Sequence, residues 1–203
     1  MATKAKKTKL PRGPRADAQR NRLRLLETAK AVFAQKGSTA SLEEIARAAD
    51  VGIGTLYRHF PNREALIEAL YGHEVDQLVA SADRLMETQA PAVALRQWLL
   101  LFVDYIITKQ GMADVLSAIV GSSSYAASGT HMKQTAARLV EAAVASGEVS
   151  LDVEPLDLLR ALSGVANLSP GPNSKVAAKR LVDILMTGIS APQKPSGAKR
   201  PAR

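Results

Sequence analysis

Residues that usually carry out chemistry are few in this 203-residue sequence, and their spacing favours binding over catalysis. Cysteine is absent, which excludes zinc-finger, iron–sulfur and disulfide-framework proteins as well as thiol nucleophiles. His73 and His131 each stand without a second histidine at helical ligand spacing, so we expect no metal site. The serines at 122–124 lack the glycine-flanked turn of a hydrolase nucleophile. We therefore predict no catalytic residues and no cofactor, and a helical enzyme or small-molecule carrier is the weakest alternative.

The basic residues gather at the two ends of the chain. The first 24 residues hold nine Lys or Arg and one acid, and the stretch from Ala191 adds four basic residues and no acid. The segment between them has 14 basic and 18 acidic residues, a net charge of −4 within a chain of net charge +8. This distribution favours a polyanionic partner, nucleic acid above all, that the ends contact. A role of the tails in solubility alone is the alternative.

Two short helices are predicted between Ser41 and Phe60. Ser41 and Glu44 have the spacing of a capping box, in which the serine hydroxyl accepts from a first-turn amide and the glutamate reaches back to the serine amide. Apolar residues then recur at helical spacing, at Leu42, Ile45, Ala46 and Ala49. After a tight connection at 50–52, a second helix covers 53–59 and ends before Pro61. The pair predicts a helix-turn-helix.

The second helix is predicted to turn one face inward and the other to solvent. Leu56 and Phe60 point inward and hold the helix on the core. The residues left on or near the outer face are Thr55, Tyr57, Arg58 and His59. The major groove of DNA is wide enough for one helix, so this face predicts binding to double-stranded DNA. Packing of Tyr57 and a C-terminal cap role for His59 are the alternatives.

Further helices must hold this pair in place. A helix over 17–35 precedes it and ends at Gly37, and another begins near Glu64 behind an Asn62 cap. The rest of the chain predicts a flexible Ser- and Gly-rich loop over 121–129 and helices over 92–109, 112–120, 131–146, 155–168 and 174–189. No alternating strand pattern of useful length is present. We predict an all-α fold of about nine helices.

The sequence has the pattern of neither a membrane span nor a secretory signal. The longest apolar run, 98–103, is far below the roughly 18 residues that a membrane span needs. The basic N-terminus is not followed by the apolar stretch of a secretory signal. We expect a soluble, cytoplasmic protein without a membrane partner.

The segments around this helix pair resemble the signature of the TetR/AcrR family of transcription regulators. The matching segments lie in roughly the first third of the chain and are 31–37, 41–46, 51–60 and 62–66. The most diagnostic piece is the Gly-Thr-Leu-Tyr-x-His-Phe run at 54–60. The remainder is similar to the family in helix count and apolarity, most like an SbtR-type branch.

The resemblance implies a DNA-contact role for particular residues. The second helix would be the recognition helix, with Ile53, Gly54, Thr55, Tyr57, Arg58 and His59 on it. Arg58 is the candidate for a guanine or phosphate contact, because its guanidinium can donate two bonds to O6 and N7. Phosphate contacts are expected from Tyr57, His59 and Arg63, and Thr55 is expected to touch a thymine methyl or a phosphate. Ser41 and the basic residues Lys9, Arg12 and Arg15 of the N-terminal arm complete the predicted set.

The sequence departs from the family's pattern in two ways. Asp50 stands where a glycine usually fills the turn, and Asp tolerates a left-handed backbone better than most residues. Gly52 and Ile53 stand where the family often has a Ser-Lys pair, which weakens the cap of the recognition helix and removes a cation. We expect this to affect base specificity rather than the fold.

The resemblance also implies a ligand cavity and a dimer interface in the second domain. The aromatic and methionine residues that would line the cavity are Trp98, Phe102, Tyr105, Met112 and Met132, with an ordinary core as the alternative. Asp104, Tyr105 and Lys109 are the polar groups best suited to orient a ligand. The last two helices would pair with those of a second copy through Leu156, Leu159, Leu162, Val165, Leu181, Ile184 and Leu185, or pack within the chain instead.

Together these features predict a homodimeric transcription regulator, a repressor that leaves its operator DNA when a small-molecule effector binds. The predicted parts are a disordered basic arm over 1–16, a helix-turn-helix domain over 17–64, an effector-binding and dimerisation domain over 65–190 and a disordered basic tail over 191–203. A non-specific architectural DNA-binding protein is the alternative.

Overall fold

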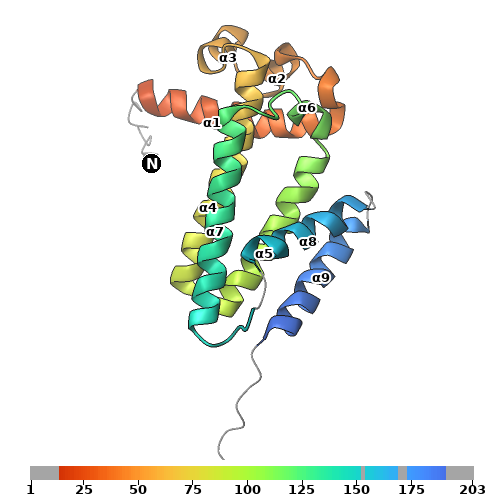
Figure 1. The fold of residues 1–203 in the computed structure, drawn as a ribbon. Helices are drawn as coiled ribbons and strands as arrows, with labels where there is room; N and C mark the ends of the chain where they lie inside the picture. Colours follow the sequence, from red (N-terminus) through yellow and green to blue (C-terminus); the bar gives the residue numbers. More distant parts are fainter. Residues whose placement is uncertain (1–13, 152–153, 169–172, 191–203) are drawn as a thin grey trace, which may run out of the picture. The chain divides into compact units, whose positions relative to one another are not determined.

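The computed structural model describes residues 14–151, 154–168 and 173–190, and within these ranges every regular element is a helix (Figure 1). An isolated antiparallel bridge joins Val149 and Ser190. The chain divides into two compact units, 1–70 and 71–203. The all-α fold predicted from the sequence is confirmed.

The N-terminal unit consists of three helices and the first turns of a fourth. Its elements are α1 (Pro14–Lys36), the 3-10 helix η1 (Gly37–Thr39), α2 (Leu42–Ala48), α3 (Ile53–His59) and the start of α4 (Arg63–Thr88). α1 packs against both short helices, and its Leu25, Leu26, Ala29 and Phe33 are fully buried. Ile45 from α2 and Leu56 from α3 are fully buried as well. Apolar burial at helical spacing therefore holds the helix-turn-helix together.

Local signals end these helices where the sequence predicts. Gly37 takes a positive φ of 57° directly after α1, the left-handed conformation that ends a helix without a Cβ clash. Asp50 takes a φ of 52° in the turn between α2 and α3, so the aspartate supports the left-handed turn that glycine usually fills. The Asn62 side chain accepts from the Ala65 amide at 2.8 Å and caps the start of α4.

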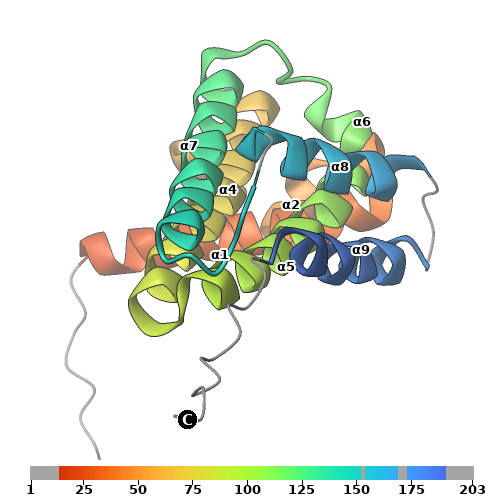
Figure 2. The ribbon, with the colours of Figure 1, turned by 60° about the horizontal axis from the view of Figure 1, so that its bottom comes forward.

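The C-terminal unit is a bundle around α5 (Pro91–Gln110). α5 packs against α7 (Ser123–Ala145), α8 (Pro155–Leu168) and α9 (Ser174–Ile189), with the short α6 (Ala113–Leu116) between α5 and α7 in the chain. Figure 2 shows α8 and α9 side by side, and both pack against α5. The Trp98 indole is fully buried and donates to the Leu78 carbonyl oxygen at 2.9 Å, which ties α5 to α4.

α5 is the one described helix that is long and apolar enough to cross a membrane by length and composition, with a mean hydropathy of 1.3. Its apolar side chains, from Ala94 to Ile106, are largely buried against neighbouring helices. A core helix of a bundle has the same composition, because it is surrounded by other helices.

Four predicted boundaries need correction. α1 begins at Pro14, so 14–16 are helical rather than part of a disordered arm; proline is tolerated in a first helical turn. The first compact unit ends at Leu70 rather than at residue 64. α6 has four residues instead of the predicted nine. The predicted loop over 121–129 is mostly the start of α7, since the Ser122 hydroxyl accepts from the Tyr125 amide at 3.1 Å and caps that helix.

Candidate nucleic-acid interface and ligand cavity

The recognition-helix candidate α3 is buried on one side and open on the other. Leu56 is fully buried and Phe60, directly after the helix, is 1% exposed. On the opposite side Tyr57 is 44% exposed, Ile53 is 40% exposed and Arg58 is exposed too. Thr55 and His59 are half-buried. The predicted orientation of this helix is therefore confirmed.

α3 itself makes few stabilising polar contacts. Its N-cap is Gly52, which has no side chain to satisfy the first-turn amides. A Cβ built at Gly52 or at Gly54 meets nothing within 4 Å, so the start of the helix has free space around it. The basic residues Arg58 and His59 occupy its last turn, and the helix contains no acidic residue. Its outer face therefore offers the Arg58 cation and backbone amides to an anion.

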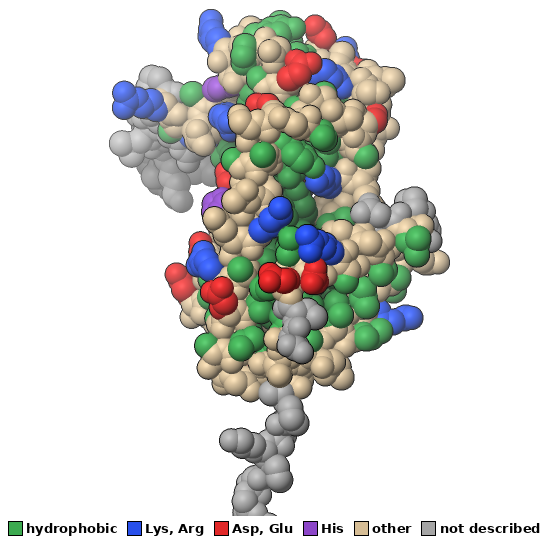
Figure 3. All heavy atoms as spheres, viewed as in Figure 1, with side chains coloured by type: hydrophobic (Ala, Val, Ile, Leu, Met, Phe, Trp, Pro, Cys, Tyr) green, Lys and Arg blue, Asp and Glu red, His purple; other side chains and the backbone are tan. Residues whose placement is uncertain are grey.

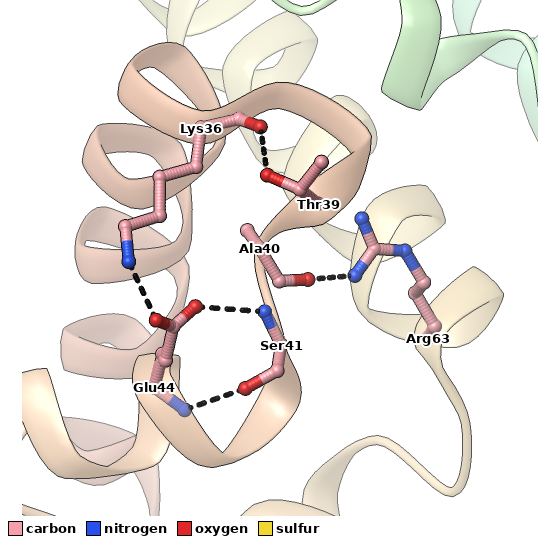
Figure 4. A network of polar contacts seen from close by, with 6 residues as sticks. All are labelled: Lys36, Thr39, Ala40, Ser41, Glu44 and Arg63. Atoms are coloured by element: carbon pink, nitrogen blue, oxygen red, sulfur yellow. Dashed lines mark hydrogen bonds and ion pairs between the residues drawn. The ribbon is translucent and has the colours of Figure 1, made fainter.

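The start of α2 carries the polar network that α3 lacks (Figure 4). The Glu44 amide donates to the Ser41 hydroxyl at 3.1 Å, and the Ser41 amide donates to the Glu44 carboxylate at 3.1 Å, which confirms the capping box. The Lys36 ammonium, at the end of α1, lies 2.5 Å from the same carboxylate. The Lys36 hydrogen bond and the Ser41 amide lower the pKa of Glu44 below its ordinary value.

Two arginines brace this unit by stacking on phenylalanine rings. The Arg63 guanidinium lies 4.9 Å from the Phe33 ring centroid, donates to the Ala40 carbonyl oxygen and donates to the Ser38 carbonyl oxygen at 3.0 Å. The Arg22 guanidinium lies 5.2 Å from the ring centroid of Phe60. These contacts tie α4 and the end of α3 to α1 and to the segment before α2.

The C-terminal unit contains a cavity of about 740 Å³, within the usual range for small-molecule sites. Its walls come from α5, α7 and α8, with Tyr71 from α4 and Leu116 from α6. The apolar wall residues include Phe102, Ile106, Leu116, Met132, Leu156 and Leu159.

The polar part of the cavity wall is a lysine among tyrosines. The Lys109 ammonium donates to the Tyr125 hydroxyl at 2.7 Å and lies 5.4 Å and 5.0 Å from the ring centroids of Tyr71 and Tyr125. These two rings stack with centroids 4.6 Å apart. The Tyr105 hydroxyl is buried without a hydrogen bond of ordinary geometry. Burial, and to a lesser degree the Tyr71 side chain, raise the pKa of Tyr105 well above its usual value, so its phenol stays protonated.

Comparison with known proteins identifies the family. Residues 25–70 match the model for bacterial regulatory proteins of the tetR family, and residues 90–191 match the C-terminal domain of SbtR-like transcriptional regulators. A TetR transcriptional regulator from Streptomyces coelicolor is 43% identical and superposes with a TM-score of 0.75, over 84% of this chain and 98% of that one. The chain belongs to the TetR family.

Other TetR-family proteins match over different extents. A TetR transcription regulatory protein from Mycobacterium vanbaalenii is 31% identical with a TM-score of 0.70, over 88% of this chain and all of that one. The HTH-type transcriptional repressor KstR of Mycolicibacterium smegmatis is 35% identical over 34% of this chain and 35% of its own length. A Staphylococcus aureus HTH-type transcriptional regulator is 29% identical over 58% and 62%. The matches to these two curated relatives thus span about a third to three fifths of the relatives' length.

TetR-family membership makes the N-terminal unit a DNA-binding domain of a transcriptional regulator. Of its predicted contact residues, Tyr57, Arg58, Ile53 and Gly54 are exposed on α3. Arg15 is exposed on α1, whereas Lys9 and Arg12 lie outside the described residues. Ser41 and Arg63 have hydrogen-bond partners within the unit, so each has a structural role. The sequence indicated this role for Ser41 but not for Arg63. Their contacts with DNA stay predictions.

The cavity of this TetR-family protein includes part of the predicted ligand-binding set. Phe102, Tyr105 and Met132 line it, whereas Trp98 and Met112 do not. The Trp98 indole N–H donates to the Leu78 carbonyl oxygen, and its ring is enclosed in the core. Met112 is likewise buried, 3% exposed, and is not part of the wall.

One polar candidate lies elsewhere, and several wall residues were missed. The Asp104 carboxylate pairs with Lys175 at 3.0 Å and Lys179 at 3.1 Å, so it joins α5 to α9. Tyr71 and Tyr125 were missed because they come from α4 and α7, and no spacing within one helix signals their meeting at Lys109.

The predicted dimer residues divide by burial. Leu159 and Leu162 are buried within one copy, so they belong to the core of the chain, and Leu159 lines the cavity. Leu156, Val165, Leu181 and Leu185 are half-buried, and Ile184 is 60% exposed. Val176 on α9 and Leu168 on α8 are exposed apolar residues as well. The accessible members leave an apolar face on α8 and α9.

Proposed function

We propose that this TetR-family protein is a homodimeric repressor that reads a two-fold symmetric operator through α3 and leaves it when an effector enters the cavity. The observation that supports the DNA-binding part is the exposed face of α3, which Leu56 and Phe60 anchor from behind. An outward helix of this kind fits the major groove, and the groove edges carry the base-specific pattern of donors and acceptors.

Within α3, residue types divide the contacts into reading and positioning. Arg58 is exposed, and its guanidinium can donate two bonds to a guanine edge. Tyr57 and His59 would bond phosphates, and Thr55 would touch a thymine methyl or a phosphate. Ile53 and Gly54 would lie close to the DNA at the open start of the helix. Ser41, Arg63 and the arm residues Lys9, Arg12 and Arg15 would add phosphate contacts.

A second copy supplies the affinity that one seven-residue helix lacks, because two recognition helices address two half-sites. The apolar residues that α8 and α9 leave accessible, Ile184 and Val176 above all, support an interface there. Pairing these faces would remove apolar surface from water. A regulator that binds operator DNA would act in the cytoplasm.

An effector acts on this equilibrium only by binding the DNA-competent and DNA-free states with different affinity. The cavity in the C-terminal unit offers a site of suitable size. Allosteric coupling of roughly 1–3 kcal/mol would change operator affinity about 5- to 150-fold.

Selection of bound fragments from random DNA tests the DNA-binding proposal. We expect a palindromic consensus with half-sites about one helical turn apart. Arg58→Ala should weaken binding to that consensus by about 1–3 kcal/mol and relax one base position. Arg84→Ala, an equal loss of charge at an exposed position of the other unit, serves as the control.

Two results would contradict the proposal. Binding without a consensus, together with a steep salt dependence, would favour a non-specific architectural protein. Unchanged consensus binding by Arg58→Ala would show that the recognition face is wrongly assigned.

A further inference from the structure

The charges of the cavity wall differ in sign from the charge of the segment around it. Lys109, Lys133 and Arg160 line the cavity, and no Asp or Glu does among the residues that the structure describes. The sequence between the basic ends carries a net charge of −4. A wall with three basic residues and no acid therefore differs from the average charge of this segment. A cleft lined by charges of one sign attracts a ligand of the opposite sign.

The three cations differ in how far their charge is already used. Asp157 pairs with Arg160 at 2.8 Å. Lys133 is exposed and forms no ion pair with any residue in the described ranges. In Figure 3 basic side chains lie beside apolar ones over α7 and α8, the two helices that carry Lys133 and Arg160. Lys133, whose charge is unpaired among the residues described, would draw an anion toward the cavity, and Arg160 would do so less because Asp157 pairs with it.

Lys109 is half-buried and keeps donors available. An ammonium group has three N–H donors, and the bond to the Tyr125 hydroxyl at 2.7 Å uses one. The ring faces of Tyr71 and Tyr125 stabilise the positive charge of Lys109 by cation–π contacts. These contacts do not replace hydrogen bonds from the other two N–H groups. Lys109 is thus a cation fixed in place by two tyrosines, with N–H donors left for a ligand.

Tyr105 adds a neutral donor on the same side of α5. It precedes Lys109 by four residues, which places both side chains on one face of the helix. Its buried hydroxyl has no hydrogen-bond partner of ordinary geometry, and a buried unpaired donor costs free energy that a ligand acceptor would recover. Glu74 influences the pKa of Tyr105 but does not line the cavity.

We propose that the cavity takes a small organic carboxylate with an apolar body, whose carboxylate accepts from Lys109 and Tyr105. Phe102, Ile106 and Met132 provide an apolar wall for the body of the ligand. A cationic ligand would face the like charges of Lys109 and Lys133, and a neutral one would leave Lys109 without a charged partner. This proposal rests on the proposed function in treating the cavity as the effector site, and it adds the ligand class.

Calorimetric titration of the full-length protein without DNA tests the ligand class directly. The probes are naphthoate, naphthamide and naphthylmethylammonium, which share a ring system and carry one negative charge, none and one positive charge, together with octanoate, octanamide and octylammonium. We expect at least one carboxylate to bind roughly tenfold or more tightly than its amide and its ammonium analogue. Equal or tighter binding of the amide or the ammonium analogue in both series, or binding of neither carboxylate, would overturn the proposal.

Variants locate the charge. Lys109→Met should abolish the preference for carboxylate over amide, Lys109→Arg should keep it, and Tyr105→Phe should reduce it. Lys175→Met is the matched control, because Lys175 pairs with Asp104 outside the cavity wall and Asp104 retains Lys179. Circular dichroism checks that each variant is folded. An undiminished preference in folded Lys109→Met would overturn the assignment.

Operator binding, measured separately, keeps the two proposals distinguishable. Carboxylate binding without any change in operator affinity would contradict effector release while the ligand class stands. Release of DNA by an amide or an ammonium analogue alone would support effector release and overturn the ligand class.

Discussion

α2 and α3 are helices of equal length, seven residues each, yet they are stabilised in opposite ways. α2 begins with a reciprocal capping box and an ion pair to the end of α1. α3 has a glycine at its N-cap, which provides no side-chain cap, and it leaves Ile53 and Tyr57 exposed. The difference indicates that α2 is a support held by its own polar contacts. α3 depends on anchors behind it, so that its outer face remains available to DNA.

The largest effect should come from removing an anchor of α3. Phe60→Ala should lower the free energy of unfolding by about 3–5 kcal/mol, because it deletes a fully packed ring. It also removes the ring on which Arg22 stacks. Denaturant unfolding measures the loss, and Tyr57→Ala, an exposed aromatic on the same helix, is the control. Similar losses in both variants would contradict the division of α3 into a buried and an open face.

The brace at the start of α4 comes next. Arg63→Met should destabilise the protein by about 1–3 kcal/mol, because the carbonyl oxygens of Ser38 and Ala40 lose their donor. Arg63→Lys should recover only part of this, since an ammonium cannot reproduce the planar fork. The unfolding temperatures of both variants and of the wild type measure this order of stability. If Arg63 served phosphate binding alone, operator affinity would fall while the unfolding temperature stayed constant.

A smaller effect is expected at the cap of α2. Ser41→Ala removes the acceptor for the Glu44 amide and should cost about 0.5–2 kcal/mol. Thr55→Ala removes a hydroxyl within α3 that forms no helix cap, so it should change stability less. Denaturant titration compares the two, and an equal loss would remove the contrast between α2 and α3.

The cap should also depend on pH. The pKa of Glu44 in the folded protein lies below the ordinary value of 4.5, so its stabilisation is complete above that pH and is lost as the pH falls through the lowered pKa. The stability difference between the wild type and Glu44→Gln should therefore shrink on acidification below about pH 4.5. Unfolding temperatures across this range measure it, and a difference that stays constant would show that the carboxylate charge contributes nothing.

The smallest effect is a gain. Gly52 lies at the N-cap of α3 with an extended backbone and free space around its Cβ position, so Gly52→Ser can add the missing cap. We expect a stabilisation of a few tenths of a kcal/mol, the usual difference between serine and glycine at this position. Differential scanning calorimetry detects it. A loss of stability would show that α3 tolerates no side chain at its start.

Local chemistry alone determined much of this protein. α3, α8 and α9 begin and end at the residues that the sequence predicts, because apolar spacing, proline and glycine act within a few residues. The capping box and the left-handed Asp50 were predictable for the same reason. The outward face of α3 follows from Leu56 and Phe60 once the helix is placed.

The tertiary structure decided everything that depends on residues distant in the sequence. Arg63 is a brace because the carbonyl oxygens of Ser38 and Ala40 meet it across a turn, and no spacing along α4 indicates that meeting. Trp98 is enclosed in the core, while Lys109, on the same helix, faces a cavity between tyrosines from two other helices. A helix face records that it is apolar, but only the packing of its neighbours determines whether that face is core, cavity or accessible surface.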